Sequence, residues 1–122
     1  FRRLLTSGAV FLKHGRHGSP HPRFVWCSAD LRTIYWRAVG ETAVRGALQA
    51  SDVVQVRPGR TTPVFQRSSK AGREDASFSL ITSSRTLDLE VELLGEPVAF
   101  GARPAEAKAR DVWVRAFEFL LK

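Results

Sequence analysis

Strict alternation of apolar and charged residues near the C-terminal third of the chain is the strongest constraint on its fold. Between Thr86 and Leu93, the apolar residues Leu87, Leu89, Val91 and Leu93 alternate with Asp88, Glu90 and Glu92. A period of two is typical of a β-strand with one face buried and the other in water. With the apolar run at 78–82 and the connection at 83–85, this segment predicts a hairpin whose three acids lie in water.

Other short apolar runs are separated by glycine, proline and polar residues. Strands are expected at Ala9–His14, Arg23–Cys27, Thr33–Arg37, Ala47–Gln49, Asp52–Arg57, Phe78–Thr82 and Thr86–Leu93. The residues Pro63, Val64 and Phe65 predict one helical turn inside a loop. After Pro104, which suits a first helical turn, apolar residues follow helical spacing from Ala105 to Leu121. The chain is therefore predicted to be one mostly β domain, residues 1–122, closed by a single C-terminal helix.

The composition fits one globular domain that favours anionic partners. Of the 122 residues, 43% are hydrophobic and 25% are charged, as in ordinary folded chains. The net charge of +7 favours phospholipid headgroups, nucleic acid or acidic protein surfaces. No apolar run reaches the roughly 18 residues of a membrane-spanning helix. Because the chain has no methionine, even at its start, we interpret it as a domain of a longer protein.

The tryptophans and the single cysteine are expected in the core. Trp113 and Phe117 lie on the apolar stripe of the C-terminal helix, and Trp26 and Trp36 lie in apolar strands. Cys27 also lies in an apolar strand, where a small core residue is more common than a nucleophile. A lone cysteine excludes an intrachain disulfide and favours the cytosol.

The connection between the first two predicted strands is strongly basic. The first 28 residues contain no acidic side chain, and the eleven positions 13–23 hold Lys13, His14, Arg16, His17, His21 and Arg23. Glycine and proline keep this connection open, and nothing negative neutralises it. Cations of this kind hold phosphate oxygens by charge-assisted hydrogen bonds, which arginine makes in pairs. The segment therefore predicts a phosphate-binding loop.

In this order and spacing, the segments resemble a pleckstrin homology (PH) domain over nearly the whole chain. The similar segments are 8–13 (GAVFLK), 56–67 (VRPGRTTPVFQR), 78–81 (FSLI), 86–89 (TLDL) and the final helix with Trp113. The type is that of phosphoinositide-specific phospholipases C, plant FYVE-containing regulator-like proteins and apicomplexan acylated homologues. The resemblance implies a partly open seven-stranded barrel or sandwich, capped by the C-terminal helix, with a headgroup pocket between the first two strands.

The resemblance also implies which residues bind the headgroup. Lys13 and Arg23 match the family's phosphate clamp, and Arg16 adds to the same field. Further basic positions of strong binders fall on Gly15, His21 and Glu41, and Arg37 is expected to substitute for the last. The ligand-binding set is thus Lys13, Arg16, His21, Arg23 and Arg37. Singly phosphorylated inositides, phosphatidic acid or generic anionic lipid are as compatible with it as a doubly phosphorylated inositide.

A second basic cluster lies in the middle of the chain. It contains Arg57, Arg60, Arg67, Lys70 and Arg73. Each cation close to an anionic surface contributes on the order of 1 kcal/mol to binding. Arg57, Arg60 and Arg67 are therefore expected to form a secondary basic surface, with an ordinary solvated loop as the alternative.

Enzymatic and metal-binding functions are not indicated. The chain has no nucleophile-elbow motif, no phosphate-binding glycine loop of the P-loop type and no zinc-type ligand spacing. The histidines of the basic loop are interrupted by glycine and proline and lack a cysteine or carboxylate partner. We therefore expect no catalysis, no metal and no cofactor.

Two functions remain open. The first is a non-catalytic domain that binds phosphoinositide or other anionic phospholipid and brings its parent protein to the cytosolic face of a membrane as a peripheral component. The alternative is a protein-interaction module with little lipid specificity, which would bind a partner of the parent chain. Nucleic acid is not indicated as a partner, because the aromatic residues alternate into the predicted core and form no stacking platform.

Overall fold

The computed structural model describes residues 1–15, 18–67, 72–93 and 101–121. Arg16 and His17 of the basic loop, and Lys70 of the second cluster, lie outside these residues. The sequence-based expectations about these three side chains therefore stay predictions.

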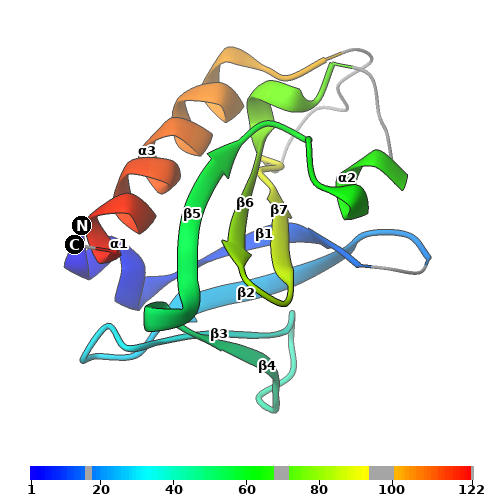
Figure 1. The fold of residues 1–122 in the computed structure, drawn as a ribbon. Helices are drawn as coiled ribbons and strands as arrows, with labels where there is room; N and C mark the ends of the chain where they lie inside the picture. Colours follow the sequence, from blue (N-terminus) through cyan, green and yellow to red (C-terminus); the bar gives the residue numbers. More distant parts are fainter. Residues whose placement is uncertain (16–17, 68–71, 94–100, 122) are drawn as a thin grey trace.

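Seven strands and one long helix make up most of the described chain (Figure 1). The strands are β1 (Ala9–His14), β2 (His21–Cys27), β3 (Thr33–Ala38), β4 (Val44–Gln49), β5 (Val53–Pro58), β6 (Ser77–Thr82) and β7 (Thr86–Glu90). The helices are α1 (Arg2–Ser7), α2 (Pro63–Arg67), α3 (Pro104–Leu120) and the short 3-10 turns η1 (Ala50–Asp52) and η2 (Glu74–Ala76). The predicted strands, the helical turn at Pro63 and the final helix are confirmed. Helix α1 was not anticipated.

All seven strands form one antiparallel sheet in the order β4-β3-β2-β1-β7-β6-β5. The sheet is open, because β4 and β5 are its two edges although they follow each other along the chain. In the middle of this order β1 pairs with β7, and Lys13 lies opposite Leu89. This is the predicted seven-stranded open architecture, and α3 packs beside the sheet with α1 near its C-terminal end (Figure 1).

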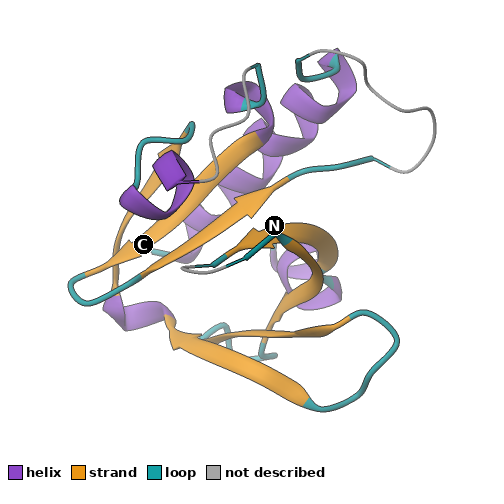
Figure 2. Ribbon diagram, turned by 90° about the vertical axis from the view of Figure 1, so that its right-hand side faces the viewer, coloured by secondary structure: helices purple, strands orange, loops and turns teal. Residues whose placement is uncertain are grey.

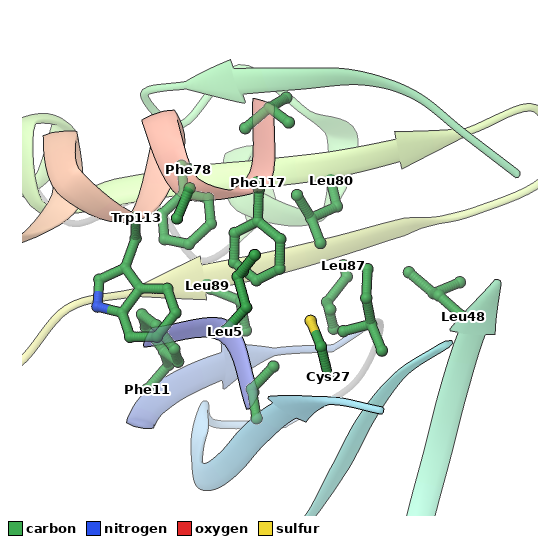
Figure 3. Close-up of a cluster of buried hydrophobic side chains, with 14 of the residues drawn as sticks. Leu5, Phe11, Cys27, Leu48, Phe78, Leu80, Leu87, Leu89, Trp113 and Phe117 are labelled. Carbon is green, nitrogen blue, oxygen red and sulfur yellow. The ribbon is translucent and has the colours of Figure 1, made fainter. Parts of the chain in front are cut away.

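The core lies between the inner face of the sheet and helix α3 (Figure 3). Trp113 and Phe117 enter it from α3, and the Trp113 ring meets Phe11 at 5.2 Å between centroids. Cys27 is also buried there, and burial raises the pKa of its thiol to about 12. The predictions that these three residues belong to the core are confirmed.

The cross-strand register separates an inner from an outer face on β1, β2 and β3. Residues directly opposite each other share a face, so Val25 and its partner Trp36 both point inward and are buried. Trp26 points outward, is half-buried and stacks between Phe24 and Tyr35. The prediction that Trp26 belongs to the core is therefore wrong, because its position in the alternation is the outer one.

Two of the three acids predicted to lie in water are buried, which corrects that prediction for Asp88 and Glu90, whereas Glu92, beyond the end of β7, is exposed as expected. Asp88 and Glu90 are 0% and 1% exposed. The inner face of β7 packs into the apolar core, as expected. Its other face is covered by the chain between β5 and β6, including α2, whose Phe65 is also fully buried. Period two identified the strand correctly, but both of its faces are covered.

Candidate functional site

The candidate site lies where β1 and the β6–β7 turn meet at one end of the open sheet. Lys13 is close to the end of β1, and Arg85 is the last residue of the turn before β7. The described residues of the β1–β2 connection, 15 and 18–20, follow the Lys13 end of β1, on the side of the molecule that faces the viewer in Figure 2. The pairing of β1 with β7 brings these two cations together although 72 positions separate Lys13 from Arg85 in the sequence.

Both cations lie against the ring of Trp36, which we call the Trp36 platform. The Lys13 Nζ atom is 5.5 Å from the ring centroid, and the Arg85 guanidinium carbon is 5.3 Å from a ring centroid of the same side chain. Gly46 on β4 lies opposite Trp36, and an added Cβ there would come within 2.3 Å of the ring. The glycine therefore lets the platform lie flat against β4.

The electrostatic environment of Lys13 is positive. Burial lowers the pKa of Lys13, the charges of Arg85 and Arg23 lower it further, and Asp88 opposes them. Asp88 itself accepts hydrogen bonds from three hydroxyls, those of Thr62, Ser79 and Thr86. An anion bound beside Lys13 would relieve this repulsion.

Arg23 and His21 lie across the β1–β2 pair from Lys13. His21 is the direct partner of Lys13, and Arg23 is the partner of Phe11, so all share the inner face. The Arg23 Nη1 atom donates a hydrogen bond to the Pro22 carbonyl at 3.0 Å. The structure thus brings three of the five predicted ligand residues to the same end of the inner face.

A cleft of about 1090 Å³ opens beside Lys13 on the α2 side of β1. It is lined by Lys13, His14, Gly15, Pro63, Val64, Arg67, Thr82, Ser84, Arg85 and Thr86. Three of these are cations, and hydroxyls from the β6–β7 turn add hydrogen-bonding groups. Within the described part of the chain, none of Lys13, Arg23, Arg67 and Arg85 makes an ion pair with a carboxylate. The cleft is therefore chemically suited to a phosphorylated anion.

The structure does not bring Arg37 to this cleft. Arg37 is the direct partner of Phe24 on the outer face, and its guanidinium lies 4.6 Å from the Phe24 ring. Its Nη1 atom donates to the carbonyl of Glu41 at 2.8 Å. Arg37 and Lys13 thus lie on opposite faces of the sheet, because side chains alternate along β3 and Arg37 is at an outward-pointing position.

The second basic cluster is divided between surface and interior. Arg57 is half-buried and Arg67 is exposed at the cleft. Arg60 and Arg73 are 8% and 5% exposed and make ion pairs inside the protein. The prediction that Arg60 contributes to a basic surface is therefore wrong, because its guanidinium is buried and forms an ion pair with Glu90.

Glu90 is the centre of this buried charged network. It accepts hydrogen bonds from Arg60 Nη1 at 2.8 Å and Arg73 Nε at 2.9 Å, and it lies 3.0 Å from His14 Nε2. Burial alone would raise the pKa of Glu90, but the bonds from His14, Arg60 and Arg73 lower it to about 2. Arg73 also binds Glu106 of α3 at 2.8 Å. The network links β1, β7 and α3 to Arg60, which precedes α2, and to Arg73, which precedes η2, and it reaches the cleft through His14.

Arg85 is the site residue that the sequence did not identify. The available signal was a cation in a three-residue hairpin connection, Ser83-Ser84-Arg85. That signal is weak, because cations are common in turns and only the β1–β7 pairing places this turn beside Lys13.

Two further observations concern the described residues only. They contain no group of three histidine, cysteine, aspartate or glutamate side chains placed to hold a metal ion. None of the helices in the described ranges is both long and apolar enough to cross a membrane.

No protein-family model matches the sequence. Several solved structures have the same fold. PLC21 from S. officinalis matches with a TM-score of 0.66 and 12% identity, over 98% of this chain and 16% of that protein. The N-terminal PH domain of human ARAP2 matches with a TM-score of 0.60 and 18% identity, over 94% of this chain and 77% of that one.

The PH domain of TgAPH is similar as well, with a TM-score of 0.63 and 18% identity over 99% of this chain and 85% of that one. The predicted resemblance is therefore confirmed, and the chain has the PH fold. At identities this low, the likeness concerns the fold. Domains with this fold commonly bind lipids or proteins.

Proposed function

We propose that this domain binds the phosphorylated headgroup of an anionic phospholipid in the cleft beside Lys13 and thereby brings its parent protein to the cytosolic face of a membrane. The observation that carries the proposal is the convergence of Lys13, Arg23 and Arg85 without a carboxylate partner in the described chain. Phosphate oxygens would supply the negative charge that balances these cations, through charge-assisted hydrogen bonds. Arg67 extends the cationic lining from α2. His21 on β2 does not line the cleft but is the direct cross-strand partner of Lys13.

The roles within the site follow from burial. Lys13 is half-buried on the Trp36 platform, so it is held in place before any ligand arrives. Arg85 and Arg67 are exposed and can adjust to the headgroup. Among the described residues that line the cleft, His14 is the one side chain suited to act as a general acid or base, and it is held by Glu90. This lining supports binding of a phosphorylated group rather than catalysis on it.

The test is co-sedimentation with vesicles of phosphatidylcholine that contain a few per cent of a phosphoinositide or of phosphatidic acid. Lys13→Ala with Arg85→Ala should weaken binding by about a hundredfold, since each removes a charge-assisted hydrogen bond of about 1.5 kcal/mol or more. The matched control, Arg32→Ala with Arg115→Ala, removes two exposed cations that lie in the β2–β3 connection and on α3. It should change binding only slightly.

Equal losses in the two double variants would mean that a diffuse positive surface, and not the cleft, attracts the membrane. Wild-type protein that binds none of these vesicles would contradict the lipid proposal. The protein-interaction alternative would then be favoured.

A further inference from the structure

The outer face of β1, β2 and β3 carries a patch that the headgroup cleft does not use. Phe24, Trp26 and Tyr35 form a continuous stack, with centroids 5.5 Å and 5.4 Å apart. Two exposed valines flank the stack, Val10 at 49% and Val39 at 53%. We call these residues, together with Arg37, the outer aromatic patch.

The outer aromatic patch borders a groove of about 500 Å³. Its lining consists of Val10, Phe24, Trp26, Arg37, Val39, Gly40, Glu41 and Thr42. The Arg37 guanidinium lies over the Phe24 ring at 4.6 Å and near the Trp26 ring at 5.9 Å. The single acid of the lining, Glu41, lies 3.4 Å from Arg45, so its charge is partly compensated. The surface is thus apolar and aromatic, with a positive end.

The patch is continuous with the end of the sheet that carries the cleft. Arg23 pairs with Ala38, so the next residue, Val39, leaves β3 at the level where Pro22 and His21 begin β2. His21 in turn pairs with Lys13. A surface that presents a headgroup to Lys13 therefore lies close to Val39 as well.

We propose that the outer aromatic patch enters the interface of the same bilayer whose headgroup occupies the cleft. In this arrangement Val39 lies deeper in the bilayer than Trp26. This inference rests on the proposed function and adds the lipid surface itself as a second partner. Tryptophan and tyrosine favour the boundary between headgroups and acyl chains, where one end of the side chain is apolar and the other is wet. Arginine can remain at headgroup level while its stem lies on apolar surface.

The proposal also explains how weak headgroup binding becomes stable attachment. A single membrane signal usually gives reversible binding, and stable attachment takes two. The cleft supplies a charged signal and the patch an apolar one, on adjoining surfaces of one domain. Val54 on β5 is the comparison residue: it is 69% exposed, but it lies on the opposite edge strand of the sheet, away from β1, β2 and β3.

The first experiment compares Val39→Asp with Val54→Asp in vesicle binding. Both variants add the same charge at an exposed valine. Val39→Asp should weaken binding about tenfold, which corresponds to burial of one valine side chain, and should keep the wild-type preference among headgroups. Val54→Asp should have less than about a threefold effect. Equal effects of the two variants would overturn the proposal.

The second experiment uses tryptophan fluorescence with vesicles whose acyl chains carry bromine. Trp36 and Trp113 are 4% and 8% exposed, so quenching on binding reports mainly on Trp26. Quenching should occur in the wild type and be lost in Trp26→Phe, which keeps an aromatic ring in the stack. Wild-type binding without quenching would overturn this inference and leave the proposed headgroup cleft in place. If the Lys13→Ala, Arg85→Ala variant lost binding but Val39→Asp did not, the cleft would be supported and the patch would not.

Discussion

Glu90 shows how a single residue organises the wall of the cleft. Its carboxylate is almost fully buried, yet it is surrounded by His14, Arg60 and Arg73. Removing one partner of a buried ion pair is costly because the remaining charges stay buried without compensation.

Glu90→Gln should therefore lower the free energy of unfolding by about 3–5 kcal/mol, measured by denaturant unfolding. Glu118→Gln on the exposed face of α3 is the control and should stay within about 0.5 kcal/mol of the wild type. A loss below about 1 kcal/mol for Glu90→Gln would show that the network is replaceable by neutral hydrogen bonds.

The same residue shows where sequence reasoning failed. Alternation correctly identified β7 and its apolar side. The assignment of Lys13 and Arg23 as headgroup ligands came from the resemblance to a PH domain and stays a prediction. Nothing in the local pattern shows that α2 covers the acidic side of β7. The interior positions of Arg60, Asp88 and Glu90 depend on contacts between segments 26 to 30 positions apart, which are not visible in periodicity.

At the scale of elements, the β3–β4 pair positions the Trp36 platform. Gly46 is required there because a Cβ would overlap the Trp36 ring at 2.3 Å. Gly46→Ala should lower the free energy of unfolding by about 1–3 kcal/mol, as overpacking does, and should also weaken vesicle binding because the platform carries Lys13.

The control is Gly15→Ala, where no atom lies within 4 Å of an added Cβ. Its stability should match the wild type within about 0.5 kcal/mol. Thermal unfolding of both variants measures the difference, and equal melting temperatures for Gly46→Ala and wild type would show that the ring moves aside without cost.

Element types were predicted more reliably than the faces they present. The strands and α3 follow from hydrophobic spacing, which depends on nearby residues. Trp26 was predicted to lie in the core and Arg37 in the headgroup site, but the cross-strand pairing places both side chains on the outer face of the sheet. Which residues of β2 and β3 point inward is established by the pairing of Val25 with Trp36, both of which are buried on the inner face.

At the scale of the whole molecule, stability should fall in acid. The folded-state pKa of Glu90 is about 2, below its ordinary value of 4.5, so its carboxylate stabilises the fold fully above pH 4.5. That contribution is lost as the pH falls from 4.5 toward 2, where the folded carboxyl also takes up a proton. The shift corresponds to about 3 kcal/mol.

The measurement is the free energy of unfolding in urea between pH 7 and pH 2. The wild type should lose this amount between pH 4.5 and 2, and Glu90→Gln should show a flatter profile over the same range. Parallel profiles would mean that other carboxyls dominate acid unfolding.

The pairing of β1 with β7 has a consequence for synthesis. In a chain made from its N-terminus, β1 can pair with β2 early, but its other edge has no partner until residues 86–90 have left the ribosome. Until then the first four strands expose an unpaired edge, which is a site for misassembly between nascent chains. Productive folding of this domain therefore waits for the last hairpin and for α3, so translation speed over its final third should govern its yield.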